Sequence, residues 1–368
     1  MKIGVPKEIK KHEYRVGMTP HSVKAYVKSG HQVIVEKGAG VGSGYEDAEY
    51  VACGATIIGD KGDLFKQSEM IVKVKEPLAE EYPLFHAGQI LYTYLHLAAN
   101  KELATELMKR KVTGVAYETI ELPDRSLPCL TPMSEIAGRL SVQEGAKYLE
   151  KEFGGRGILL GGVPGVQRGK VGILGGGIVG TNACKIAVGI GANVTVLDIN
   201  AKRLAYLDDI FGSSITTLYA TEANIEYVLK ESDIVIGAVL VAGETAPRLI
   251  TRQHLSIMQH GAVIVDVAID QGGCAETSRP TTHDDPIYIV DNVVHYCVAN
   301  MPGAVARSST IALTSVTLPY GLQLAGLGLK PALKANEALK RGLNTFDGAC
   351  VHAGVAKSCG LPFTEYKV

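Results

Sequence analysis

The chain has 368 residues, about twice the usual size of a domain, so its length predicts two domains with room for substantial hydrophobic cores. It carries 37 basic and 38 acidic residues, and this balance provides no basic face for nucleic acid. Hydrophobic residues make up 46% of the chain, which excludes a disordered protein.

The cellular setting is predicted from the cysteines and the apolar segments. The seven cysteines include no C-x-x-C pair, so they provide neither a disulfide framework nor a zinc-ribbon site. The first residues contain only a short apolar stretch, and we expect a cytoplasmic protein without a secretory signal. The uncharged span 308–329 is long enough to cross a membrane, but it is rich in small and polar residues and contains Pro319. It therefore predicts a buried helix, and no membrane partner is expected.

The first part of the chain alternates short β-branched runs with amphipathic segments, a pattern typical of a parallel sheet covered by helices. We expect strands to begin near Ile3, Gln32, Ala55, Met70, Ile90 and Val112. Helices are expected between them, including 20–29 and 101–111. A linking helix is then expected over 133–152, with Ser134 as its N-cap.

The same alternation returns in the second part of the chain. Strands are expected to begin at Lys170, Asn193, Ser214, Asp233, Ala262 and Val293. Helices are expected over 178–190, 201–211, 221–230 and 251–259. After the uncharged segment comes one more amphipathic helix, near 333–346, with no further strand.

This pattern predicts an α/β protein with two doubly wound, Rossmann-like domains. The tail has no sheet of its own, so it is expected to complete the first domain, which becomes discontinuous. We expect a substrate (catalytic) domain formed by 1–128 and 306–368, and an NAD-binding domain formed by 129–305.

A nucleotide-binding turn is predicted at KVGILGGGIVG, where a strand leads directly into Gly175, Gly177 and Gly180 at G-x-G-x-x-G spacing. The glycines permit a tight turn, a close approach of pyrophosphate and close packing of a helix on the strand. Asp198 ends the next strand, where a carboxylate accepts hydrogen bonds from ribose hydroxyls and repels a 2′-phosphate. NAD is therefore favoured over NADP. Arg203 is a cation near that position, but with Asp198 in place we expect it to cover the adenosine.

Titratable side chains follow several strands of the first predicted sheet. Lys75, His96 and Glu118 each lie at or just beyond the end of a strand, and Arg15 follows the first strand. Because ligands bind beyond the carboxyl ends of such strands, Arg15 and Lys75 predict a small anionic substrate. Histidine suits proton transfer near neutral pH, whereas Glu118 is expected to have a structural or orienting role.

The second predicted sheet adds Asp270, just beyond the strand AVIVDVA, where it is expected to face a nicotinamide. Asp266, inside that strand, is expected to be structural. No H-x-x-x-H or H-E-x-x-H spacing supports a metal site, and no G-x-S-x-G turn supports a serine nucleophile.

Five segments of the sequence are distinctive: MKIGVPKEIKKHEYRVGMTP, LYTYLHLAAN, GILGGGIVG, VDVAIDQGG and NMPGAVARSST. Together they resemble the alanine dehydrogenases of bacteria, and the resemblance covers essentially the whole chain. It implies a homohexameric cytoplasmic enzyme that uses NAD to convert L-alanine reversibly to pyruvate and ammonium. It also implies that Arg15 and Lys75 bind substrate and that His96 and Asp270 are catalytic. The cofactor-lining residues that it implies, besides the three glycines, are Ser134, Asp198, Arg203, Ala220, Val239, Leu240, Val267, Arg279, Asn300 and Met301.

The chain departs from the family pattern at two places. Ala220 stands where many members have a hydroxylated residue, and Gln323 and Leu327 stand where some members have a Glu and His pair for magnesium; no metal is predicted. Three alternatives to an alanine dehydrogenase remain open. They are the nucleotide-binding part of a transhydrogenase, a saccharopine dehydrogenase, and a catalytically silent NAD-sensing regulator.

Overall fold

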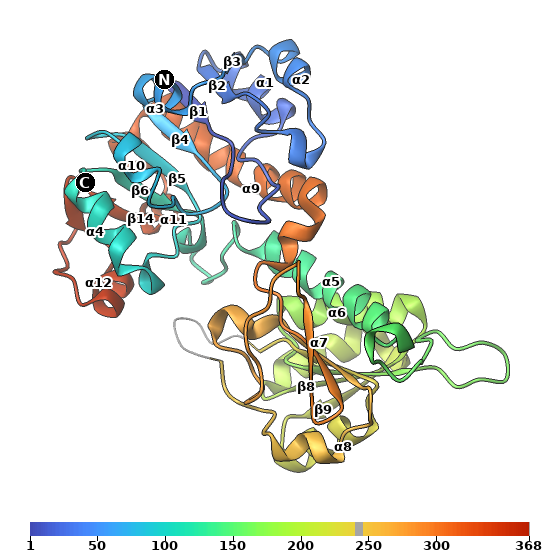
Figure 1. Cartoon of the computed structure of the whole chain (residues 1–368). Helices are drawn as coiled ribbons and strands as arrows, with labels where there is room; N and C mark the ends of the chain where they lie inside the picture. The colour runs from blue at the N-terminus through green and yellow to red at the C-terminus, as the bar shows by residue number, and fades with distance from the viewer. Residues whose placement is uncertain (240–245, 368) are drawn as a thin grey trace. The chain divides into compact units, whose positions relative to one another are not determined.

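The computed structural model describes residues 1–239 and 246–367, which form two compact units (Figure 1). One unit consists of Met1–Met133 and Val305–Val368, and the other of Ser134–Ala304. The first boundary falls inside helix α5 (Thr131–Tyr148), a few residues beyond the boundary predicted at 128/129. The predicted division into a substrate domain and an NAD-binding domain remains a proposal.

Helix α5 corrects one detail of the sequence prediction, because Ser134 lies within the helix and is not its N-cap. The helix begins at Thr131 and Pro132, and proline is well tolerated in the first turn, where its missing N–H costs nothing. The Thr131 hydroxyl donates to the carbonyl of Leu127, 3.0 Å away.

The first unit contains a mostly parallel sheet with the strand order β15-β14-β6-β5-β4-β1-β2-β3. Its parallel strands are β1 (Lys2–Val5), β2 (Gln32–Glu36), β3 (Thr56–Ile58), β4 (Met70–Val72), β5 (Ile90–Thr93) and β6 (Thr113–Ala116). The antiparallel strands β14 (Leu343–Phe346) and β15 (Ala349–Cys350) extend it beyond β6. Read from β3 to β6 the order is that of a doubly wound sheet, and it reverses between β1 and β4.

The helices of the first unit come from both stretches of the chain. They are α1 (Pro20–Lys28), α2 (Asp47–Ala52), α3 (Lys61–Gln67), α4 (Lys101–Lys109), α9 (Ala306–Leu327), α10 (Leu329–Ala335), α11 (Glu337–Arg341) and α12 (Ala353–Cys359). Helix α9 is the predicted uncharged helix, with Pro319 inside it. No helix within residues 1–239 and 246–367 is long and apolar enough to cross a bilayer.

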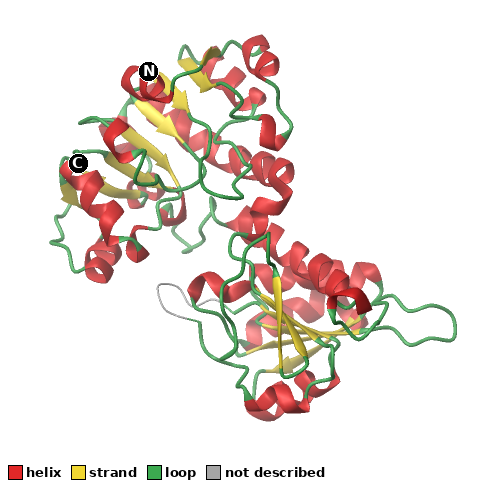
Figure 2. Ribbon diagram, viewed as in Figure 1, coloured by secondary structure: helices red, strands yellow, loops and turns green. Residues whose placement is uncertain are grey.

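The second unit contains a sheet with the strand order β12-β13-β11-β10-β7-β8-β9. Its strands are β7 (Lys170–Leu174), β8 (Asn193–Asp198), β9 (Ile215–Tyr219), β10 (Ile234–Gly237), β11 (Val263–Asp266), β12 (Ile287–Val290) and β13 (Val293–Tyr296). Helices α6 (Ile178–Ile190), α7 (Ala201–Phe211) and α8 (Glu222–Glu231) pack on it (Figure 2). The order reverses between β7 and β10, so both units confirm the predicted α/β fold.

The structure contradicts two expected helices, and the described residues include three strands that were not expected, β12, β14 and β15. The expected helix 251–259 is only a short 3-10 turn, Gln253–Ile257, and the edge strand β12 was not anticipated. The expected helix 333–346 is divided because Asn336 caps α11 through the N–H of Leu339 and Gly342 ends that helix. The following residues form β14, whose Thr345 pairs with Gly114 of β6.

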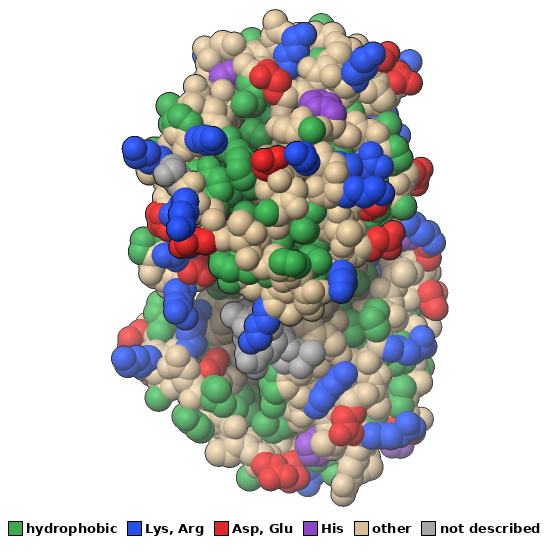
Figure 3. Space-filling view, turned by 90° about the vertical axis from the view of Figure 1, so that its left-hand side faces the viewer, with side chains coloured by type: hydrophobic (Ala, Val, Ile, Leu, Met, Phe, Trp, Pro, Cys, Tyr) green, Lys and Arg blue, Asp and Glu red, His purple; other side chains and the backbone are tan. Residues whose placement is uncertain are grey.

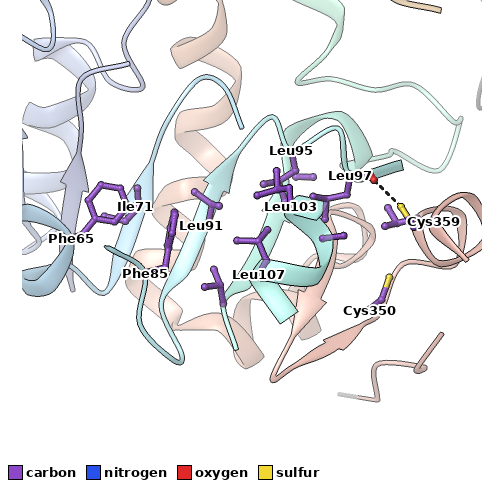
Figure 4. Close-up of a cluster of buried hydrophobic side chains, with 14 of the residues drawn as sticks. Phe65, Ile71, Phe85, Leu91, Leu95, Leu97, Leu103, Leu107, Cys350 and Cys359 are labelled. Carbon is purple, nitrogen blue, oxygen red and sulfur yellow. Dashed lines mark hydrogen bonds between the residues drawn. The ribbon is translucent and has the colours of Figure 1, made fainter. Parts of the chain in front are cut away.

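The core of the first unit has a large cluster of buried apolar side chains between the sheet and its helices (Figure 4). Leu95 and Leu97, on either side of His96, belong to it and are at most 1% exposed. The thiol of Cys359, on α12, donates to the carbonyl of Leu97 at 3.0 Å. The C-terminal segment therefore helps to fix the turn that carries His96.

Candidate active site

The polar residues of the first unit gather where its strand order reverses. Arg15 follows β1, Lys75 follows β4, His96 follows β5 and Glu118 follows β6. The parallel strands place their carboxyl ends on one edge, and ligands of doubly wound sheets bind at that edge beside the reversal. The fold thus brings together the four side chains that the strand-end argument selected.

Arg15 is held in a fixed orientation by Glu13. The guanidinium is 2% exposed, and its Nε and Nη2 donate to the two carboxylate oxygens of Glu13 at 2.7 and 2.6 Å. Nη1 lies 3.1 Å from the sulfur of Met133. Although burial opposes its charge, the hydrogen bonds and charge of Glu13 raise the pKa of Arg15. Glu13 was not predicted from the sequence, where its only signal is its place two residues before Arg15.

The ammonium group of Lys75 is available to bind a ligand. Its ammonium makes no hydrogen bond or ion pair with any residue among 1–239 and 246–367, whereas its backbone N–H donates to Glu8 at 3.3 Å. Burial, followed by the positive charge of Arg15, lowers the pKa of Lys75. A bound carboxylate would offset both effects.

A buried ion-pair network lies beneath this segment and was not predicted. Lys73 is fully buried, and its ammonium lies 3.1 Å from a carboxylate oxygen of Glu8 and 2.9 Å from one of Glu81. Glu8 also accepts from the N–H of Val74 at 2.6 Å. Because Glu8 follows β1 and Lys73 follows β4, the network ties together the loops that carry Arg15 and Lys75.

His96 occupies a left-handed turn with φ +49°, an uncommon backbone conformation for a residue other than glycine. Its N–H donates to Glu118 at 2.6 Å, and the N–H of Leu95 donates to the same carboxylate at 3.2 Å. This geometry agrees with the orienting role expected for Glu118. The buried side chains of Leu95 and Leu97 anchor the turn on both sides of His96, whose own side chain is 45% exposed.

The imidazole of His96 faces the carboxylate of Glu76, which was not predicted from the sequence. Its Nδ1 lies 3.5 Å from Oε2 of Glu76, and its ring stacks on Tyr94 with centroids 5.7 Å apart. Burial opposes charge on Glu76, but the neighbouring imidazole of His96 and the hydrogen bond from Lys10 hold its pKa below the ordinary value. Glu76 also follows β4, so the strand-end argument applied one residue further would have found it.

The second unit contains the glycine turn in the predicted setting. Gly175 follows β7 with φ +104°, and a Cβ on Gly180 would lie 1.8 Å from the Gly175 carbonyl oxygen. Gly177 is the N-cap of α6 without a capping side chain, is exposed, and has open space where a Cβ would stand. The first N–H groups of α6 are therefore available to an anion, as a pyrophosphate requires.

Asp198 and Arg203 both contact this turn. The two carboxylate oxygens of Asp198 accept from the N–H groups of Gly176 and Asn200, at 2.7 and 2.8 Å. The guanidinium of Arg203 donates to the Gly176 carbonyl at 2.5 Å and to the hydroxyl of Thr181. Asp198 keeps lone pairs for a ribose, and Arg203 lies against the turn with its guanidinium 4.6 Å from the Tyr206 ring centroid.

Most of the remaining expected cofactor residues follow strands of the second sheet. Ala220 follows β9, Val239 follows β10, Val267 follows β11, and Asn300 and Met301 come after β13. Arg279 lies on a loop, with its guanidinium 4.1 Å from the centroid of the Tyr288 ring. Ser134 lies in α5, and Leu240 is outside the described residues.

Asp270 lies in a 3-10 turn, Val267–Gln271, directly beyond β11, and is exposed. Asp266 has the structural role expected of it: it is fully buried and accepts from the N–H groups of Ala268 and Cys274 and the hydroxyl of Ser278. These bonds fix the turn that carries Asp270. Within the described part of the chain, no group of three or more His, Cys, Asp or Glu side chains is arranged to hold a metal ion.

Charged side chains of both signs are interspersed over the face shown in Figure 3. No single-sign field dominates that face. This distribution is consistent with the balance of basic and acidic residues in the sequence.

Comparison with known proteins identifies the family. Residues 4–137 match the model of the alanine dehydrogenase/PNT N-terminal domain, and residues 141–353 match that of the C-terminal domain. An alanine dehydrogenase of Methanococcus maripaludis is 58% identical over 99% of this chain and 98% of its own length. One of Staphylococcus haemolyticus is also 58% identical, over the same shares.

Solved structures agree with these relatives. An L-alanine dehydrogenase structure matches with a TM-score of 0.95 at 55% identity, covering 97% of this chain and 99% of the other. A transhydrogenase from Sinorhizobium meliloti matches with a TM-score of 0.83 at 25% identity, over 96% and 99% of the two chains. The resemblance noted in the sequence is confirmed, and the Rossmann-type unit implies a nicotinamide cofactor. The chain belongs to the alanine dehydrogenase/PNT family.

Proposed function

We propose that this protein catalyses the NAD-dependent, reversible oxidative deamination of L-alanine to pyruvate and ammonium. The observation that carries the proposal is the pair of cations Arg15 and Lys75 beside His96 at the strand-order reversal of the first unit. The pair suits a small carboxylate, and the relatives with 55–58% identity over nearly the whole chain are named alanine dehydrogenases.

The substrate carboxylate is assigned to Arg15, whose planar guanidinium is already oriented by Glu13. Lys75 is assigned to the substrate oxygen or nitrogen on Cα, because its ammonium has no partner among residues 1–239 and 246–367. A substrate fixed at two points presents Cα in one orientation, and this orientation supplies much of the rate.

NAD is proposed to bind at the glycine turn and at Asp198 of the second unit. The site residues assigned to it are Ser134, Gly175, Gly177, Gly180, Asp198, Arg203, Ala220, Val239, Leu240, Val267, Arg279, Asn300 and Met301. Asp198 supports NAD over NADP because its carboxylate would repel a 2′-phosphate. When bound, the nicotinamide supplies the acceptor for the Cα hydride.

Loss of the hydride and an amino proton converts alanine to iminopyruvate, which water must then hydrolyse. His96 and Asp270 are assigned to this stage, in which a proton leaves the attacking water and another reaches the departing nitrogen. One water is consumed, ammonium and pyruvate leave, and the reverse sequence aminates pyruvate. A cytoplasmic homohexamer is part of the proposal and rests on family resemblance.

The test is the appearance of NADH when L-alanine is added to the purified protein with NAD. Glycine, L-serine and L-glutamate serve as alternative substrates, and NADP as the alternative cofactor. We expect turnover that is highest with L-alanine and NAD. Tighter binding of NADPH than NADH would contradict the cofactor assignment, and NADH binding without turnover of any amino acid would favour a regulator.

A further inference from the structure

We propose that Glu76 is a positioning residue for His96: it holds the imidazole with Nδ1–H directed at its carboxylate, leaving Nε2 to exchange protons with the substrate. The inference deepens the proposed function, in which His96 is an acid/base group. The catalytic contact belongs to His96, and Glu76 acts through it.

The first support is an unsatisfied oxygen on Glu76. Oε2 is buried and accepts no hydrogen bond within the described part of the chain, yet it lies 3.5 Å from Nδ1 of His96. A buried carboxylate oxygen without a donor is costly, and a slightly shorter approach of the imidazole satisfies it. Catalytic hydrogen bonds are often long before substrate binds.

The second support is that Glu76 is itself anchored. Its other oxygen, Oε1, accepts a hydrogen bond from the ammonium of Lys10 at 2.5 Å, and the Glu76 side chain is only 13% exposed. One oxygen is thus used to fix the carboxylate, and the other is directed at the histidine. This division of roles between two oxygens is typical of an orienting carboxylate.

The third support is that the backbone of His96 is fixed independently. Glu118 binds the N–H groups of Leu95 and His96, and Leu95 and Leu97 are buried in the core. With the backbone held, the ring orientation depends on the groups that face it, namely Tyr94 and Glu76. Nε2 makes no hydrogen bond with any residue of the described ranges and remains available.

The charges near the imidazole decide the sign of the expected effect. The carboxylate of Glu76 and the ring of Tyr94 face it, Glu118 binds the backbone N–H of His96, and the positive charges of Lys10 and Lys75 act on Glu76. The charged carboxylate accepts from Nδ1–H and polarises the ring, which makes Nε2 a better nucleophile. An amide in its place carries no charge, so Glu76→Gln should lower the reactivity of Nε2.

The experiment compares Glu76→Gln and Glu76→Asp with the control Glu80→Gln, an exposed residue in the same loop without an ion pair in the described structure. Diethyl pyrocarbonate acylates the free nitrogen of a neutral imidazole, so the rate of His96 modification at one mildly alkaline pH, read by peptide mass spectrometry, reports the reactivity of Nε2 without requiring activity. We expect Glu76→Gln to lower this rate severalfold, and Glu76→Asp and Glu80→Gln to stay near the wild type.

Kinetics provide the second measurement. In Glu76→Gln we expect kcat for L-alanine to fall about ten- to hundredfold, less than the loss of the acid/base group itself, while KM and NADH affinity change little. Glu76→Asp should recover part of kcat. An unchanged rate of His96 modification in Glu76→Gln, with kcat equal to that of Glu80→Gln, would overturn the inference. If the wild type fails to oxidise L-alanine, the proposed function fails, and the modification rate still tests the Glu76–His96 pair.

Discussion

At the scale of single residues, Arg15 and His96 are held by neighbouring carboxylates, of which the strand-end pattern reveals Glu118 but not Glu13. Arg15 is oriented by Glu13 and the His96 backbone by Glu118. The pattern selected Arg15, Lys75 and His96 because their place in the chain follows a strand. It could not select Glu13, since its contact with Arg15 depends on how the loop after β1 folds.

Replacing the proposed acid/base groups tests the division between chemistry and cofactor binding. We expect His96→Ala and Asp270→Asn each to lower kcat by about two to four orders of magnitude. NADH affinity, measured by fluorescence titration, should remain nearly intact because neither residue belongs to the glycine turn. Loss of NADH binding with little further effect on kcat would contradict the assigned roles.

The lowered pKa of Lys75 predicts an alkaline limit to substrate binding. Its ammonium should lose its proton at a pH below the ordinary lysine value of 10.5, so the Kd of pyruvate on the NADH-bound protein should rise as pH passes that point. Arginine stays charged throughout this range. Lys75→Arg should therefore bind pyruvate with little pH dependence there, and a rise in Kd identical to that of the wild type would refute the assignment.

At the scale of elements, the strongly periodic strands, the glycine turn and the uncharged helix α9 followed from the sequence, and the elements after α9 did not. The segment 333–346 has helix-forming residues and reads as one amphipathic helix, but Asn336 and Gly342 divide it. The strand β14 that follows them is stabilised by the edge of β6, a partner more than 200 residues away. Local periodicity does not encode such a distant partner.

Thr345 tests the docking of that strand. Its hydroxyl accepts from the N–H of Gly114 at 3.0 Å and donates to the carbonyl of Val112 at 2.9 Å, all within the core. Thr345→Val should lower the free energy of unfolding by about 1–3 kcal/mol, because it leaves these backbone groups unpaired. Thr105→Val, on the exposed face of α4, is the matched control, and chemical denaturation is the measurement; equal effects would contradict the docking.

Helix α6 provides a matched pair of glycines. A Cβ on Gly180 would lie 1.8 Å from the Gly175 carbonyl oxygen, whereas nothing stands within 4 Å of a Cβ on Gly189. Gly180→Ala should therefore displace the turn, weaken NADH binding at least tenfold (~1.4 kcal/mol) and lower Tm. Gly189→Ala should bind NADH normally and gain up to about 1 kcal/mol of stability. Equal NADH affinity in both variants would refute the packing role of Gly180.

At the scale of the whole molecule, two units whose parallel strands share one order carry different chemistry at the reversal point. The first unit has Arg15 and Lys75 there, and the second has the glycine turn. Composition could predict two domains and exclude a polyanion partner, but the near-zero net charge concealed this local cationic pair. Function therefore depends on the residues in the loops at the reversal point of each unit, since the fold alone supports many activities.

The central claim is that the hydride leaves Cα of L-alanine for the nicotinamide, and isotope transfer tests it most directly. L-alanine carrying deuterium at Cα would be oxidised with NAD, and the reduced cofactor and pyruvate analysed by mass spectrometry. We predict one deuterium in each reduced cofactor and none in the solvent. Release of the deuterium to water, or an unlabelled reduced cofactor, would contradict direct hydride transfer and with it the proposed function.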